Sequence, residues 1–196
     1  DKSDDKASGG LGNDDTNDSS TPVYAHLPSG RRAVALSSGY TALSACAILD
    51  DASLVCWGEG GFKQLGRNST TDSKVPIYVT MPANKTVVQI SAGDRRFCAA
   101  MSDGTAYCWG YHGVSDYLYG GNTGPGLGDG STKQSPTPIK MTLPSGRKVT
   151  SIMGPSNAAC VSLDNGQVAC LGYGYGAGNI QKKILLTLQY ASSTST

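Results

Sequence analysis

The chain has 196 residues, and its 16 Lys and Arg residues nearly balance its 15 Asp and Glu residues, giving a formal net charge of +1. This balance argues against nucleic-acid binding, because affinity for phosphate needs clustered basic side chains. No apolar stretch reaches the roughly 18 residues of a membrane-spanning helix, so we expect no membrane insertion. Glycine, with 26 residues, is about twice as frequent as usual, which is typical of turn-rich β structure.

The first 58 residues contain one unit, which we predict in the order strand, turn, strand, hairpin. An acidic segment at 14–18 comes first. It lacks the spacing and the terminal Glu of a calcium loop, so we expect a solvated turn. β-Prone runs follow at 23–26 and 34–36, and the predicted hairpin spans 46–56. No run shows helical periodicity.

The same elements recur twice more, at 59–110 and 111–172. The β-prone runs reappear at 77–80, 87–90, 139–142 and 149–152. Gly30, Asn84 and Gly146 occupy one site of the repeat, at spacings of 54 and 62 residues, which indicates a backbone position with positive φ. A long repeat with about four short strands in each unit is typical of β-propeller blades.

Two cysteines lie ten positions apart in every unit: Cys46 and Cys56, Cys98 and Cys108, Cys160 and Cys170. A hairpin whose three-residue loop is a type I turn followed by a left-handed residue places such cysteines directly opposite each other. Opposed Cβ atoms lie about 4.5–5.5 Å apart, and closer at non-hydrogen-bonded pairs, where a cross-strand disulfide is feasible. We therefore predict three hairpin disulfides and an oxidising, extracellular environment. The alternative is three pairs of buried free thiols.

The left-handed position of the loop is glycine in two hairpins, at Gly104 and Gly166, but it is Ala52 in the first. A side chain at such a position has a steric cost that glycine avoids. We therefore expect the first hairpin either to be strained or to have another type of turn.

Several short sequences of the second unit resemble the regulator of chromosome condensation repeat: residues 90–93 (Ile-Ser-Ala-Gly), 98–99 (Cys-Ala), 103–104 (Asp-Gly) and 108–110 (Cys-Trp-Gly). The resemblance extends over most of the chain and is closest to the cysteine-containing, secreted form of the repeat. It implies propeller blades, usually seven to a ring. We therefore expect an all-β partial propeller of about three four-stranded blades, with one hairpin disulfide in each. Because three blades are too few for a ring, either the chain is a fragment or several chains complete one structure.

Few side chains suggest catalysis. Ser44, Arg96 and Ala158 stand where the family often has a histidine, and the chain has only two histidines, His26 and His112. No Ser or Cys has a nearby His to activate it, and the cysteines lack the short spacings of zinc sites. We expect no enzymatic activity, no metal and no cofactor.

Three Asn-x-Ser/Thr sequences, at Asn17, Asn68 and Asn84, fall in predicted loops. Together with the cysteine pairs, they predict a glycosylated extracellular protein. The chain begins with an acidic polar stretch and shows no signal peptide, so we expect a mature or truncated product of a secreted precursor.

An insertion at 111–125 interrupts the repeat and carries Tyr111, His112, Tyr117 and Tyr119. Tyrosine gives a large contact area at a small entropy cost and is frequent at interfaces. The insertion either packs on its own blade or contacts another subunit or a glycan.

The last segment, 173–196, is rich in Gly and Tyr at its start and in Ser and Thr at its end. Between them lies an apolar run with Ile184, Leu186, Leu188 and Tyr190. We interpret this run as a strand. An apolar strand with an uncovered edge is prone to aggregation, so proteins normally cover or pair such an edge. It either covers the last blade of its own chain or adds to a neighbouring subunit.

These features favour a non-enzymatic, glycosylated extracellular protein with a structural or adhesive role, as a subunit or fragment of a larger assembly such as a fibre. The expected partners are copies of itself or further repeats of the same polypeptide, with glycans as another class. An alternative function is recognition of a ligand or glycan through the loops of the propeller. A third is nucleotide exchange on a small GTPase, which the disulfides argue against because such a partner is cytosolic or nuclear.

Overall fold

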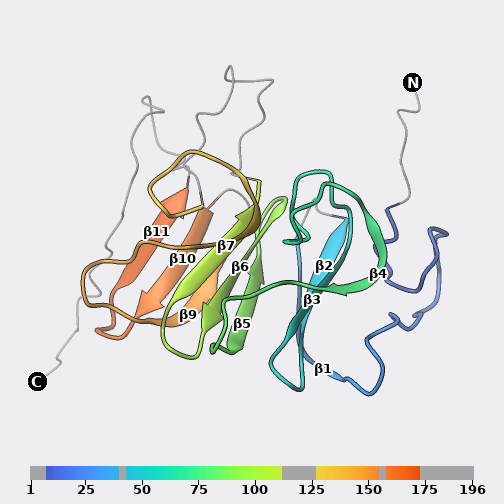
Figure 1. Cartoon of the computed structure of the whole chain (residues 1–196), viewed down its shortest axis with the longest axis horizontal. Coiled ribbons are helices and arrows are strands. Elements are labelled where there is room, and N and C mark those ends of the chain that lie inside the picture. Colours follow the sequence, from blue (N-terminus) through green and yellow to red (C-terminus); the bar gives the residue numbers. More distant parts are fainter. Residues whose placement is uncertain (1–7, 40–42, 112–126, 155–157, 173–196) are drawn as a thin grey trace, which may run out of the picture.

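The computed structural model describes residues 8–39, 43–111, 127–154 and 158–172, which form three antiparallel sheets and, within these ranges, no helix. The first sheet contains β1 (Ala33–Ser38), β2 (Ser44–Leu49), β3 (Leu54–Gly58) and β4 (Ser73–Tyr78). The second contains β5 (Val87–Ala92), β6 (Arg96–Met101), β7 (Ala106–Gly110) and β8 (Ser135–Lys140). The third contains β9 (Val149–Met153), β10 (Ala158–Leu163) and β11 (Val168–Gly172). Figure 1 shows the sheets side by side, in chain order.

The hairpins have the predicted register. Cys46 lies opposite Cys56, Cys98 opposite Cys108, and Cys160 opposite Cys170, and each pair forms a disulfide with Cα atoms 4.0–4.1 Å apart. In the second hairpin the amide of Met101 donates to the carbonyl of Thr105 at 2.9 Å and closes the three-residue loop. The three predicted disulfides and the all-β fold are therefore confirmed.

Ala52 adopts the left-handed conformation of its glycine counterparts. Its φ is 63°, compared with 81° at Gly104 and 80° at Gly166. Of the two expectations for the first hairpin, the strained one is therefore confirmed: the turn type is kept, and the alanine carries its steric cost. The repeat position of Gly30, Asn84 and Gly146 is left-handed as well, with φ values of 73°, 62° and 72°.

The outermost strands differ from the prediction. β4 begins at Ser73, before the predicted run, and contains Pro76. This proline is tolerated because β4 lies at the edge of its sheet, where a missing N–H need not break a ladder. The prediction of a strand at 23–26 was wrong, because in the described part of the chain no strand lies beside these residues.

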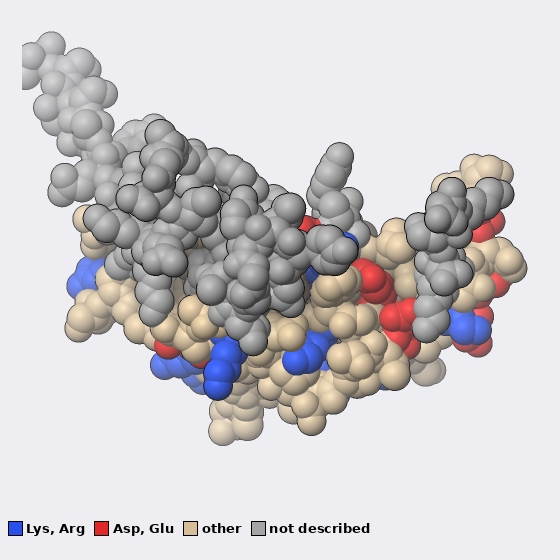
Figure 2. Space-filling model, turned by 90° about the horizontal axis from the view of Figure 1, so that it is seen from above, with Lys and Arg blue, Asp and Glu red and all other residues tan. Residues whose placement is uncertain are grey.

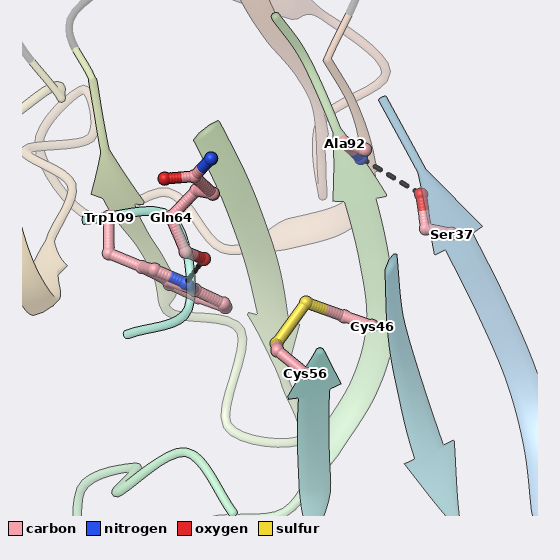
Figure 3. The surroundings of a disulfide bond; sticks show 6 residues. All are labelled: Ser37, Cys46, Cys56, Gln64, Ala92 and Trp109. Carbon is pink, nitrogen blue, oxygen red and sulfur yellow. Dashed lines mark hydrogen bonds between the residues drawn. A yellow bond between two sulfur atoms is a disulfide. The ribbon is translucent and has the colours of Figure 1, made fainter. Parts of the chain in front are cut away.

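The sheets stack through alternating faces of their strands. In β2, Cys46 and Ile48 face the second sheet and pack against Phe97 and Trp109 there. The alternate residues, such as Leu49, face the segment that precedes β1. Cys98 and Cys108 of the second sheet likewise pack against apolar residues of the third. The first two disulfides therefore lie on the face that their sheet presents to the next sheet, and Figure 3 shows the first of them.

The loop between β3 and β4 packs against the second sheet, and the segment before β1 packs against the first sheet in the same way. The indole Nε1 of Trp109 in β7 donates to the carbonyl of Gln64, in the loop between β3 and β4, at 2.9 Å. Trp57 in β3 donates in the same way to the carbonyl of Gly10 at 3.0 Å. The predicted repeat boundaries, after residues 58 and 110, fall just before these loops. Each of the first two sheets therefore takes its fourth strand, β4 or β8, from the sequence repeat that follows.

Candidate functional site: an open sheet face and a loop cluster

Side-chain hydrogen bonds join the first strands of neighbouring sheets. Ser37 Oγ in β1 accepts from the amide of Ala92 in β5 at 2.9 Å (Figure 3), and Ser91 Oγ in β5 accepts from the amide of Gly154 at 2.6 Å. Gln89 also bonds both backbone groups of Ile152, at 2.9 and 3.0 Å. Similar hydrogen bonds therefore hold the first sheet against the second and the second against the third.

One apolar position of the repeat differs sharply between the sheets. Leu36, Ile90 and Ile152 each lie six residues after the left-handed residue of their unit, at 30, 84 and 146. The exposed fraction is 67% for Leu36, 7% for Ile90 and 2% for Ile152. The preceding sheet buries the two isoleucines, whereas none of the described residues covers Leu36 in this way.

Other residues around Leu36 show the same difference. Leu11 is 41% exposed, although its counterparts Leu65 and Leu127 are fully buried. Ala33 is exposed, whereas Val149, at the same repeat position in the third sheet, is buried. We call the surface formed by Leu11, Ala33 and Leu36 the open face. The open face is apolar, like the surfaces buried between two sheets, but no other sheet covers it in the described part of the chain.

The third sheet carries the opposite surface. Cys46, Cys56, Cys98 and Cys108 are at most 1% exposed, because the next sheet covers their disulfides. Cys160 and Cys170 are only half-buried. We call the surface around this third disulfide the disulfide face. It is the kind of surface that covers Ile90 and Ile152 elsewhere in the molecule.

A loop cluster lies where the first and second sheets meet, and it consists of Glu59, Phe62, Gln64, Arg95, Arg96 and Tyr111. The guanidinium of Arg95 lies 3.9 Å from the ring centre of Phe62, and Phe62 meets Tyr111 edge-on with ring centres 5.5 Å apart. Gln64 accepts from the amide of Phe62 at 2.8 Å and donates to Glu59 at 3.1 Å. These contacts hold aromatic and charged side chains together.

Arg96 is the unusual member of the loop cluster. Its side chain is 1% exposed, and none of its three guanidinium nitrogens has a hydrogen-bond partner among the described residues. Burial lowers the pKa of Arg96 to about 10, although the nearby charge of Asp94 opposes this shift. Burial also raises the pKa of Glu59 above its usual range. A buried cation that has no hydrogen-bond partner among the described residues is costly, so this position favours a carboxylate hydrogen-bonded to it.

The structure places the predicted site residues as follows. The six cysteines form the three disulfides, and Asn17, Asn68 and Asn84 are all exposed. Tyr111 is buried in the loop cluster. The other predicted interaction residues lie outside the described residues: His112, Tyr117, Tyr119, Ile184, Leu186, Leu188 and Tyr190.

The described residues contain no group of three or more His, Cys, Asp or Glu side chains that could hold a metal ion. In the acidic segment at 14–18, Asp15 accepts hydrogen bonds from Asn17 and Thr16, which lower its pKa. On the face shown in Figure 2, basic and acidic side chains are interspersed with broad areas of other residues. The described part of that face carries no continuous basic stripe.

Two models of the regulator of chromosome condensation (RCC1) repeat match the chain, at residues 51–100 and 87–114. Human E3 ubiquitin-protein ligase HERC2 is 27% identical over 160 residues, which cover 82% of this chain and 3% of HERC2. The mitochondrial RCC1 domain-containing protein RUG3 of Arabidopsis thaliana is 31% identical over 130 residues, covering 63% of this chain and 26% of RUG3. The chain thus spans about a quarter or less of the length of these two relatives.

Two solved structures share the fold. Human WBSCR16 matches 84% of this chain and 40% of its own with a TM-score of 0.66 and 16% identity. Prp20p from Saccharomyces cerevisiae matches 82% of this chain and 39% of its own with a TM-score of 0.61 and 20% identity. The sheets therefore have the fold of propeller blades, and residues 51–114 match the repeat of the regulator of chromosome condensation family.

Proposed function

We propose that this chain is a non-enzymatic, extracellular interaction module whose open face binds another propeller blade, in a second copy of the chain or in a further repeat of the same polypeptide. The observation that carries the proposal is the exposure of Leu36, 67% against 7% and 2% at the equivalent positions of the other blades. Covering a leucine side chain stabilises an interface by about 1.5–3 kcal/mol.

The disulfide face of the third blade is the natural partner of the open face. Cys46 and Cys56 cover Ile90 in the contact between the first two blades, and Cys160 and Cys170 occupy the same repeat positions. A contact between unlike faces joins molecules head to tail. Such a contact either closes into a ring or continues as a filament, which is how a structural or adhesive assembly would form.

Three intramolecular disulfides favour an oxidising environment outside the cell. The side chains of Asn17, Asn68 and Asn84 are exposed, so each is accessible for glycosylation. Both features support an extracellular glycoprotein. Mass spectrometry of protein secreted from its native source, before and after enzymatic deglycosylation, tests which of the three sites carry glycan.

Sedimentation of the unreduced protein over a range of concentrations tests the assembly. We expect the native chain to associate and Leu36→Asp to remain monomeric. Val88→Asp is the matched control, because Val88 is 58% exposed on the second blade and belongs to no blade contact. A native chain that stays monomeric, or a Leu36→Asp variant that associates normally, would contradict the proposal.

A second candidate function, ligand recognition at the loop cluster, is favoured by Arg96. Arginine binds carboxylates through two parallel hydrogen bonds, and such a ligand would supply a partner that the described residues do not offer. Thermal unfolding in glutamate, against sodium chloride of the same ionic strength, tests this function. We expect glutamate to raise the unfolding temperature of the native chain and not that of Arg96→Met. Equal shifts in both proteins would exclude it.

A further inference from the structure

The segment before the first blade has the local structure of an outermost strand. At the start of β4, Ser73 Oγ donates to the carbonyl of Val75 at 2.7 Å, and at the start of β8, Ser135 Oγ donates to that of Thr137 at 2.6 Å. Ser19 Oγ donates to the carbonyl of Thr21 at 2.6 Å in the same arrangement. Residues 19–24 therefore correspond to β4 and β8, although no strand lies beside them in the described part of the chain.

The segment at 10–26 also contacts the first blade. Its contacts match those that the loop and outer strand of the first blade make with the second blade. The amide of Asp14 donates to the carbonyl of Lys74 at 3.0 Å, and the amide of Asn68 donates to that of Pro136 at 2.9 Å. Asp14 and Asn68 stand at equivalent repeat positions, and both are left-handed, with φ values of 62° and 58°. The acceptors, Lys74 and Pro136, are equivalent too.

A third equivalence fixes the end of the segment. The amide of His26 donates to the carbonyl of Gly12 at 2.8 Å, as the amide of Thr142 donates to that of Gly128 at 2.7 Å. Residues 10–26 are thus the loop and fourth strand of a blade. The three inner strands of that blade are not among the described residues. Tyr24, at the position of Tyr78, is 93% exposed.

The third blade has the complementary gap. Its described part contains β9, β10 and β11 in the order β11-β10-β9, so β11 forms an edge where β4 and β8 pair in the other two blades. In the first blade, Tyr78 lies opposite Val55 and Ser73 opposite Gly58. The same register places Tyr24 opposite Ala169 and Ser19 opposite Gly172.

We propose that residues 19–24 of one copy form the fourth strand of the third blade of a second copy, antiparallel to β11. The inference rests on the proposed function and adds to it the strand and the register through which the two copies join. Pro22 fits this place, because β4 and β8 carry Pro76 and Pro138 at the same position. Figure 1 shows the segment and β11 at opposite ends of the molecule, so one chain cannot make this contact with itself.

A photo-cross-linker tests the register without adding a thiol that could exchange with the native disulfides. Tyr24 is replaced by p-benzoylphenylalanine, the variant is mixed with isotope-labelled native chain, and the cross-linked peptides are identified by mass spectrometry. We expect cross-links from position 24 of one copy to residues around Ala169 of the other. The same replacement at Tyr78 is the matched control, because it cross-links to Val55 within one copy.

The possible failures are distinguishable. If the chains associate and Leu36→Asp prevents it, but position 24 cross-links elsewhere, the strand pairing is wrong and the proposed function stands. With p-benzoylphenylalanine placed instead at Ala169 in β11, cross-links to residues 184–190 of the same chain also overturn the inference, because that edge is then occupied. If the chains do not associate, both proposals fail. If the Leu36→Asp substitution abolishes the cross-link from position 24 to Ala169, the open face and the pairing of residues 19–24 with β11 belong to the same contact between copies.

Discussion

The first and second blades have the same elements but not the same neighbours. The second blade is covered on one face by the first and on the other by the third, and Ile90 is almost fully buried. Among the described residues, another blade covers the first blade only on the face that carries the Cys46–Cys56 disulfide, and Leu36, at the position of Ile90, is two-thirds exposed. This repeat therefore has an apolar residue at a position that a neighbouring blade covers. The exposure of Leu36 at that position is the reason why we propose a binding surface there.

Truncating the equivalent residues of the two blades gives the largest expected difference. Ile90→Ala removes buried methyl groups and leaves a cavity, so we expect it to lower the free energy of unfolding by about 2–5 kcal/mol. Leu36→Ala removes exposed atoms, and in dilute, monomeric protein we expect a change within about 0.5 kcal/mol. Urea unfolding of both variants measures the difference. Equal losses would mean that Leu36 is already covered in the monomer.

The disulfides extend the comparison to the third blade. Replacing Cys98 and Cys108 together by alanine removes a cross-link over ten residues, and the chain-entropy estimate of its contribution is about 2–3 kcal/mol. Alkylation during mild reduction checks the accessibility of each bond. Cys160 and Cys170 are half-buried, so we expect them to be labelled first, and the buried pairs only after the blades separate. Simultaneous labelling of all three pairs would contradict this order.

A smaller effect separates the hairpin loops. Ala52→Gly keeps the left-handed turn and removes its steric cost, so we expect a gain of about 0.5–1 kcal/mol in unfolding free energy. Gly166→Ala is the reverse change in the third blade. A Cβ at Gly166 meets no atom within 4 Å, so its expected loss of about 1 kcal/mol comes from the backbone alone. Thermal or urea unfolding measures both. A loss of stability in Ala52→Gly would refute the assigned strain.

The smallest effect concerns the pH dependence of one loop. Hydrogen bonds from Lys85 at 2.7 Å and from Thr105 at 2.6 Å lower the pKa of Asp103. The native state therefore favours the ionised carboxylate, and this stabilisation is present above the unfolded pKa, about 3.9. It is lost as the pH falls through the native pKa. The carboxylate is exposed to solvent, so its contribution is small.

Asp103→Asn isolates this contribution, and Asn165 shows that asparagine fits the same loop position in the third blade. We expect the variant to be less stable than the native chain at pH 7 and the difference to shrink at pH 3. Urea midpoints at the two pH values provide the measurement. A difference that grows on acidification would have the wrong sign.

The hairpins, disulfides and left-handed positions could be predicted because they depend on local spacing. A separation of ten positions between two cysteines sets the register of a hairpin without information from the rest of the fold. The prediction of a strand at 23–26 failed because a strand also needs a partner strand, and none lies beside this segment in the described residues. Its sequence resembles that of β4, but the environment of β4 is missing.

The loop cluster was largely missed for a related reason. Residues 59–64 lie between β3 and β4 of the first blade and residues 95–96 begin the hairpin of the second, and only the stacking of the blades brings them together. Two signals were present in the sequence. Tyr111 was singled out in the insertion, and Arg96 stands where the family often has a histidine. The assignments at 112–125 and 184–190 stay predictions.

The position of the disulfides constrains how the protein is made. Four of the six cysteines lie inside the contacts between blades and are at most 1% exposed. Thiol–disulfide exchange needs direct access to sulfur, so no oxidising enzyme can reach these residues once the blades are docked. The first and second hairpins must therefore be oxidised before the next blade packs against them. A hairpin that docks before oxidation leaves two reduced cysteines sealed in the core, where later exposure to an oxidant cannot repair them.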